Sequence, residues 1–398
     1  MSAEESSPLA GTGPDDPERS IRSKLVIIGV ALVFVMVAYA YVGTRDRSID
    51  VEDPALISQQ QEDGLICCML AYEHDGEQFL LVVTRELEGE FRRVVFRVME
   101  FDDDGAPREI NAIGSPFDGV LPTRFSVVDQ TAYVPLDGSG GAGIWTVDVS
   151  DPAWPEDAGF TETGEGPTRQ LAARGDVLAI NHTDEIAVLD ISDRYQAEII
   201  SRFEQPVSGV VTMKMVDSWL IINDAVNDEF RIYDLTAPRS PEMLLSHRNP
   251  DGPGELEFDF GTADAEDRLN QTAIPSRYLD YAVSGDIVYL AASDLGLRLL
   301  DISDPESPVI LGEMELPDRA VRVELQGDRL FVLGASTGNV EQLTYSIHAL
   351  DISEPLDPAL VDTINGILSE PGIQVLTVEE ERLFLGLYES ILVFDAGD

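Results

Sequence analysis

The sequence has 398 residues, of which 44% are hydrophobic and 25% charged, and its formal net charge is -48. The hydrophobic share excludes a chain that is disordered throughout, and the acidic surplus argues against a nucleic-acid partner, because a phosphate backbone attracts lysine and arginine. Lysine occurs only at Lys24 and Lys214, and such an acidic, lysine-poor surface suits a protein in concentrated salt, where screening lengths fall to about 3 Å at 1 M.

The N-terminal region predicts a membrane anchor. Residues 1–24 are rich in Ser, Gly, Pro and acidic residues, and we expect a disordered, acidic cytoplasmic tail. Residues 25–42 carry no charge, and at about 1.5 Å per residue a helix of this length spans roughly 27 Å, close to the hydrocarbon thickness of a bilayer. This predicts one transmembrane helix, followed by a linker over 43–52.

Flanking charges set the expected orientation. Three basic residues precede the apolar segment and two follow it, which favours an N-terminus inside and the larger part outside: Arg19, Arg22, Lys24, Arg45 and Arg47. We therefore expect a single-pass protein of the cell membrane. The alternative is a cleaved signal peptide, because residues 38–40 resemble a small-x-small cleavage site. Residues 1–24 are acidic, however, unlike the short basic region with which a signal peptide begins.

Cys67 and Cys68 are adjacent, and they are the only cysteines. Neighbouring cysteines rarely form a sound disulfide, and their spacing does not match a zinc site. We expect two small buried residues on a strand.

Internal repetition is the strongest pattern in the chain. A hydrophobic residue, an aspartate, a second hydrophobic residue and Ser or Thr recur, often before Asp-Pro or Glu-Pro, and degenerate copies stand at both ends. The marker aspartates are Asp102, Asp148, Asp190, Asp234, Asp301, Asp351 and Asp395, spaced by 46, 42, 44, 67, 50 and 44 residues. A period of about 40 to 50 residues with short β-rich segments is typical of propeller blades. The sequence predicts an all-β fold over 53–398, a seven-bladed β-propeller of four-stranded antiparallel blades.

One repeat shows the four expected strands, at 320–325, 329–334, 344–352 and 358–364. The third strand ends at the marker. An aspartate there can close a turn through its own side chain, and the following proline presets φ. Since the same motif recurs in every blade, we interpret the marker aspartates as turn residues and not as a catalytic set.

Residues 300–312, Leu-Asp-Ile-Ser-Asp-Pro-Glu-Ser-Pro-Val-Ile-Leu-Gly, resemble the LVIVP-repeat family of propellers found in archaeal and bacterial surface proteins. The match is good near markers 148, 301 and 351, thinner at 190 and 234, and poor at 102 and 395. The resemblance implies a propeller and an extracellular location. It implies no general activity and no catalytic residues.

The fourth strand of the last blade is predicted to come from the N-terminal side of the propeller sequence. The sequence ends shortly after Asp395, whereas residues 53–57, Asp-Pro-Ala-Leu-Ile, repeat residues 357–361, Asp-Pro-Ala-Leu-Val. We infer that 53–60 supply the closing strand of the last blade, which removes unpaired sheet edges. The linker reaches at most about 35 Å, so the face with the marker turns should look toward the membrane.

The opposite face is expected to carry the partner site. The connection 248–274 is an acidic insertion on that side, and the candidate partner residues are Asp251, Glu255, Glu257, Asp259, Asp264, Glu266 and Asp267. A solvated loop is the alternative. The sequons at Asn181 and Asn270 are candidate glycosylation sites on the same face.

No catalytic motif stands out. The four histidines lie in different repeats or loops, without zinc-ligand spacing, and we expect no metal, no cofactor and no catalytic residue. The three tryptophans are expected to pack in the core or between blades. The leading hypothesis is a non-enzymatic module that binds a protein or glycan of the cell envelope through the face distal to the membrane. The alternatives are an extracellular hydrolase or lyase with carboxylates in the propeller funnel, and a structural envelope scaffold.

Overall fold

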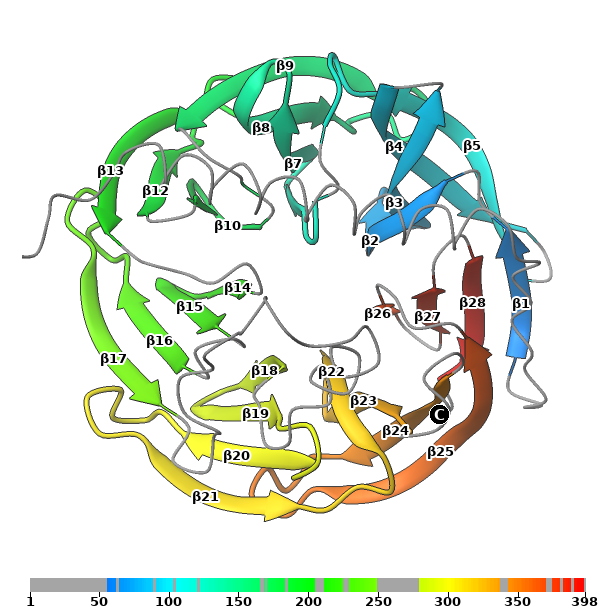
Figure 1. The fold of residues 1–398 in the computed structure, drawn as a ribbon, viewed down its shortest axis with the longest axis vertical. Helices are drawn as coiled ribbons and strands as arrows, with labels where there is room; N and C mark the ends of the chain where they lie inside the picture. Colours follow the sequence, from blue (N-terminus) through cyan, green and yellow to red (C-terminus); the bar gives the residue numbers. More distant parts are fainter. Residues whose placement is uncertain are drawn as a thin grey trace, which may run out of the picture. The chain divides into compact units, whose positions relative to one another are not determined.

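The computed structural model describes residues 56–396 except for 62–63, 89–90, 103–104, 120–121, 165–167, 169, 183–184, 205–210, 225–228, 249–278, 337–342, 370–373, 380–381 and 388–389. These residues form seven four-stranded antiparallel sheets arranged around a central axis (Figure 1). The all-β, seven-bladed prediction is confirmed. The expected tail, membrane helix and linker at 1–52 lie outside the described residues.

In six sheets the strands run outward from the centre in chain order, from an innermost first strand to an outermost fourth strand, and in the seventh sheet β1 takes the outermost place (Figure 1). The first sheet contains β2 (Leu65–His74), β3 (Glu77–Glu88), β4 (Phe91–Phe101) and β5 (Pro107–Gly114). The second contains β6 (Ser126–Val128), β7 (Thr131–Gly138), β8 (Gly141–Asp148) and β9 (Glu156–Gly164). The third contains β10 (Leu171–Arg174), β11 (Val177–Asn181), β12 (Glu185–Asp190) and β13 (Glu198–Glu204).

The second half of the ring repeats this order. The fourth sheet contains β14 (Val211–Val216), β15 (Trp219–Asp224), β16 (Glu229–Asp234) and β17 (Glu242–Arg248). The fifth contains β18 (Asp280–Ser284), β19 (Ile287–Ala291), β20 (Leu297–Asp301) and β21 (Val309–Met314). The sixth contains β22 (Arg319–Gln326), β23 (Arg329–Ala335), β24 (Leu343–Asp351) and β25 (Ala359–Ser369). The seventh contains β26 (Gln374–Glu379), β27 (Arg382–Leu387), β28 (Ser390–Asp395) and β1 (Leu56–Gln61).

The ring closes through its two ends. Strand β1 pairs antiparallel with β28, with Leu56 opposite Phe394 and Gln61 opposite Ser390. In Figure 1 the blue β1 lies beside the red β28. The strand begins three residues after the start expected at residue 53, and residues 53–55 lie outside the described part.

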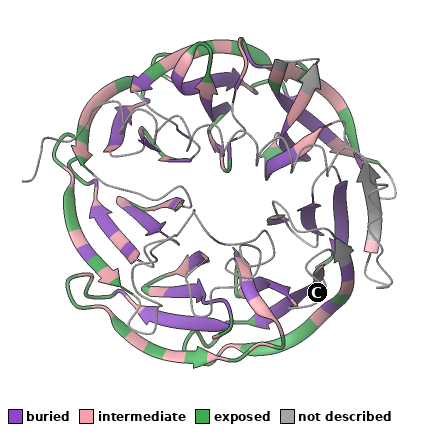
Figure 2. Ribbon diagram, viewed as in Figure 1, coloured by how far each residue is buried: buried purple, intermediate pink, exposed green. Residues whose placement is uncertain are grey.

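The core lies between neighbouring sheets. Figure 2 shows buried residues along the inner three strands and alternating exposure on the outermost strands. One cluster, for example, packs Ala179 and Val188 of the third sheet against Leu220 and Ile222 of the fourth. A strand that is buried on both sides has a continuous run of apolar residues. A fourth strand has one face in solvent, so apolar and polar residues alternate along it.

The tryptophans divide into two groups. Trp145 is fully buried in the core and its Nε1–H donates to Asp157 Oδ1 at 3.1 Å, and Trp219 is partly buried against the fourth and fifth sheets. Trp154, however, is 71% exposed in a turn after β8, so its expected core position is wrong. The exposure of Trp154 depends on its position in the turn. Residue type alone does not determine which positions of a turn point into solvent.

Cys67 and Cys68 are buried on β2 and neither forms a disulfide, as expected. Burial raises the pKa of the Cys67 thiol well above its ordinary value, so it stays protonated. These side chains act as small apolar residues of the first sheet.

Two buried arginines on third strands were not foreseen. The Arg97 guanidinium pairs with Glu86 and Glu109 and donates to Thr84 Oγ1 at 3.0 Å. Arg298 pairs with Glu313 on the adjacent fourth strand. A buried guanidinium needs such partners because its desolvation is costly.

Among the described residues, no helix is long and apolar enough to cross a membrane. The segment 25–42 is not among them.

Candidate functional site

The marker aspartates form turns. In five of the seven, Oδ1 accepts the backbone N–H two residues later at 2.7–2.9 Å: Asp148, Asp190, Asp234, Asp301 and Asp351. In the first sheet, Asp102 Oδ1 accepts from Ala106 N instead. These aspartates therefore have a local backbone role, which explains their recurrence.

In five of the seven sheets, the residue after the marker links two turns. Its side chain is buried, and its N–H donates to a carbonyl in the turn between the first and second strands of the same sheet. These residues are Val149, Ile191, Leu235, Ile302 and Ile352, with N···O distances of 2.7–2.9 Å. Both turns lie at the same end of the sheet, and we call this side of the ring the marker face. The loops that join second to third strands and successive sheets lie on the opposite face.

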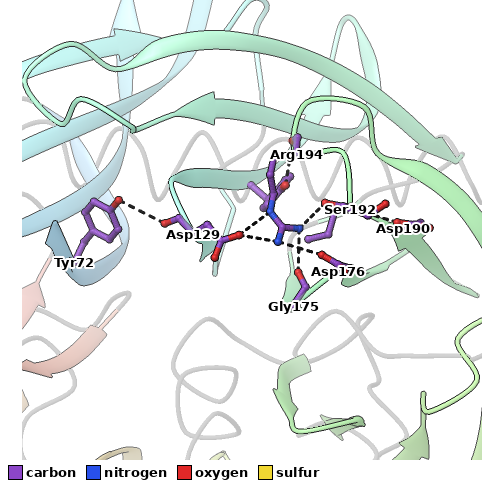
Figure 3. Close-up of polar contacts among 9 residues, drawn as sticks. Tyr72, Asp129, Gly175, Asp176, Asp190, Ser192 and Arg194 are labelled. Carbon is purple, nitrogen blue, oxygen red and sulfur yellow. Dashed lines mark hydrogen bonds and ion pairs between the residues drawn. The ribbon is translucent and has the colours of Figure 1, made fainter. Parts of the chain in front are cut away.

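Arg194 links two sheets on the marker face (Figure 3). Its Nη2 donates to Asp129 Oδ2 at 2.7 Å and pairs with Asp176 Oδ1 at 3.1 Å, while Nη1 donates to the Gly175 carbonyl. Asp129 belongs to the second sheet, and Gly175 and Asp176 belong to the third. Since every donor of this guanidinium points to a turn of the ring, we assign Arg194 a structural role.

Hydrogen bonds from backbone N–H groups hold the pKa of Asp301 and Asp351 below the usual value of 3.8, and the Ser192 side chain and backbone do the same for Asp190. Stability from a lowered carboxyl pKa is present above the unfolded-state value and is lost as pH falls below it. We expect a variant with Asn at positions 190, 301 and 351 to lose less stability than wild type below pH 3.8.

Asparagine is the suitable substitution because its amide oxygen preserves the turn acceptor while removing the charge. Thermal unfolding measured between about pH 5 and about pH 2 checks this prediction. Identical pH slopes for the two proteins would contradict it.

The structure describes one of the two predicted glycosylation candidates. Asn181 ends β11, is 9% exposed, and its Oδ1 accepts the Gln170 N–H at 3.1 Å. A glycan would be attached to Nδ2 of Asn181, in a side chain that is buried here. Asn270 and the seven acidic candidate partner residues lie within 249–278, outside the described residues.

A cavity of about 250 Å³ lies among the innermost strands. Five sheets contribute to its wall, through β6, β10, β14, β18 and β22. Its charged lining residues are Arg124, Lys214 and Glu324, and its apolar lining includes Ala172, Met213 and Ala282. The centre of the ring therefore brings charged groups from separate sheets together beside a few apolar side chains.

Lys214 is positioned by the neighbouring sheet. Its Nζ donates to the Tyr281 carbonyl, lies 5.2 Å from the Tyr281 ring centroid and is 3.7 Å from Asp280 Oδ1. The Tyr281 hydroxyl in turn donates to the Ile221 carbonyl at 2.8 Å. These contacts hold an ammonium at the cavity wall by charge attraction and a cation–π interaction.

The two carboxylates near the cavity differ in their hydrogen bonds. Asp280 is buried and accepts from Tyr281 N at 2.9 Å and from Val323 N at 3.2 Å, so both of its oxygens are engaged. Glu324 makes no hydrogen bond or ion pair with any described residue. Desolvation raises the Glu324 pKa, Lys214 and Arg124 oppose this, and Asp280 reinforces it. The described cavity residues therefore offer one uncommitted carboxylate instead of the pair that glycoside hydrolysis needs.

Arg124 is held indirectly. Its neighbour Thr123 accepts a hydrogen bond from Gln170 Nε2 at 2.8 Å, and Gln170 Oε1 accepts the Met213 N–H at 3.1 Å. This bridge joins the segment before β6 to β14. Arg124 itself forms no ion pair within the part of the chain that the structure describes. Desolvation raises the pKa of Glu324 and of Tyr281, and the charge of Arg124 opposes this rise.

A second cavity, of about 490 Å³, lies where the first and seventh sheets meet. Its lining includes Glu77, Glu100, Glu379 and Arg382. The Arg382 guanidinium lies 4.7 Å from the Phe101 ring centroid, and the Phe101 and Phe384 rings are 5.4 Å apart. The aromatic contacts bind the closing sheet to the first sheet, so this arrangement has a clear structural role.

The histidines are dispersed among the described residues, at the end of β2, after β11, in β17 and in β24. Burial lowers the pKa of His247 and of His348, with Asp318 opposing the shift at His348. No group of three potential metal ligands occurs among the described residues.

A family model described as the LVIVD repeat matches residues 279–315, which contain the whole fifth sheet. With the seven-bladed ring, this match confirms the resemblance to LVIVP/LVIVD-repeat propellers. No curated protein matches the chain.

Several solved structures share the fold. A chain of the mitotic checkpoint complex has 10% identity and a TM-score of 0.56, with 89% of this chain and 98% of that chain covered. A protein of unknown function from Desulfotomaculum acetoxidans has 13% identity and a TM-score of 0.52, with 76% and 87% covered. The computationally designed Ika8 protein has 12% identity and a TM-score of 0.50, with 84% and 98% covered. At these identities the similarity concerns the fold alone.

Proposed function

We propose that this LVIVD-repeat propeller is a non-enzymatic binding module, anchored in the cell membrane by residues 25–42 and displayed outside the cell. It binds a protein or glycan of the cell envelope through the opposite face of the ring. The start of β1 is the observation that carries this proposal. Leu56 lies opposite Phe394, next to the last marker, Asp395.

The position of β1 supports one orientation. Strand β1 begins on the marker face, which supports an approach of the anchor and its linker from that side. The linker of 43–52 is short, and it reaches at most about 35 Å. The opposite face is then directed away from the membrane and is available to partners.

The long insertion supports a partner site on that face. It joins the fourth strand β17 to the first strand β18, a connection that belongs to the opposite face by topology. Residues 249–278 contain all seven candidate acidic residues. A partner with a cationic surface would complement this charge, while screening in concentrated salt keeps the interaction dependent on close contact.

We expect deletion of residues 249–272 to abolish capture of the partner from membranes solubilised with detergent in concentrated salt. The full-length chain serves as bait, and captured proteins and glycans are identified by mass spectrometry. A length-matched control replaces the seven acidic residues with Asn or Gln and separates the contribution of charge from that of the loop. Capture of the same partners after the deletion would contradict a role of the insertion in binding.

A further inference from the structure

We propose that the central cavity binds a small aliphatic zwitterion, an α-amino acid, with the ligand carboxylate at Arg124 and its ammonium at Glu324. The site does not rest on the partner surface proposed above. It is built from different residues, on the inner strands of the ring.

The charges around the cavity balance in number. Arg124 and Lys214 supply two positive groups, and Asp280 and Glu324 supply two negative groups. A chain with a net charge of -48 thus carries a locally neutral site at its centre. A ligand with one charge of each sign preserves that balance, whereas a net anion or cation leaves one partly buried charge unpaired, which is costly.

The available groups have distinct roles. Lys214 and Asp280 are already joined to each other and to the backbone around Tyr281, so they form part of the wall. Arg124 and Glu324 have no such contacts with described residues and are the groups that a ligand can engage. A guanidinium matches a carboxylate through two parallel N–H···O bonds, and a carboxylate accepts from an ammonium.

Size and polarity restrict the ligand further. A cavity of about 250 Å³ corresponds to about eight water molecules at roughly 30 Å³ each. Ala172, Met213 and Ala282 provide apolar surface beside the charged groups. A short aliphatic side chain fits this lining, and a large polar one does not.

The test is calorimetric titration of the full-length protein in detergent and concentrated KCl with three ligands. L-Leucine carries both charges, 4-methylpentanoate carries the carboxylate alone, and 3-methylbutylamine carries the ammonium alone. We expect L-leucine to bind, and each single-charge analogue to bind at least about tenfold more weakly, because one charge-assisted hydrogen bond contributes about 1.5–3 kcal/mol.

We expect Glu324→Gln and Arg124→Gln each to weaken L-leucine binding by at least about tenfold. Glu306→Gln, an exposed acidic residue in the turn after β20, is the matched control and should bind as wild type does. Since burial disfavours the charged form of Glu324, its replacement by Gln should not lower the unfolding temperature. A folded Glu324→Gln protein with unchanged affinity would overturn the proposal.

Absence of L-leucine binding to the wild-type protein would also overturn it, as would equal binding of 4-methylpentanoate. Neither outcome affects the partner captured through the insertion. Conversely, unchanged capture after deletion of 249–272 leaves the titration result intact, so the two proposals fail separately.

Discussion

A chain that starts at residue 63 is expected to be less stable than one that starts at residue 51 by about 3–7 kcal/mol. The longer chain retains β1, and the shorter one lacks it. Strand β1 makes five registered residue pairs with β28, and each net hydrogen bond contributes about 0.5–1.5 kcal/mol. Its loss leaves the edge of β28 unpaired, so the shorter chain should also self-associate.

Urea unfolding in concentrated salt measures the difference in free energy, and light scattering measures the association. The chain that starts at residue 51 is the matched control, because it lacks the same N-terminal segment but keeps the closing strand. Equal stability of the two chains would show that β1 contributes nothing to the ring.

Replacement of Trp145 by alanine is expected to cost about 3–5 kcal/mol, the usual range for a fully buried Trp. The indole lies in the core shared by the first and second sheets, and its Nε1–H is bonded to Asp157. Trp154→Ala should change the free energy of unfolding by no more than about 0.5 kcal/mol, because that side chain is mostly in solvent.

The two substitutions remove the same side chain from positions nine residues apart, which makes Trp154→Ala a close control. Chemical unfolding followed by far-UV circular dichroism reports both, since this signal comes from the backbone and does not depend on either indole. A cost at Trp154 equal to that at Trp145 would contradict the exposure of the turn after β8.

The periodic features of this protein could be predicted because they are local. The marker aspartate and the residues after it close a turn within a few positions, so the sequence alone carries that geometry. For the sixth sheet, strands expected at 320–325 and 329–334 correspond to β22 and β23. The likeness between residues 53–57 and 357–361 pointed to the strand that closes the ring, because the repeat unit was otherwise incomplete.

The central cavity could not be predicted because its residues come from separate sheets. Arg124, Lys214, Asp280 and Glu324 belong to four different repeats, and no short motif surrounds them. The ion pairs of the buried Arg97 and Arg298 could not be predicted for the same reason. The partner of an arginine on a strand depends on the register of the neighbouring strands. The sequence by itself determined the repeat, its turns and the strand that completes it, all of which depend on short-range backbone chemistry. Only the tertiary structure decided which charges meet at the centre, because that depends on how seven sheets are arranged around one axis.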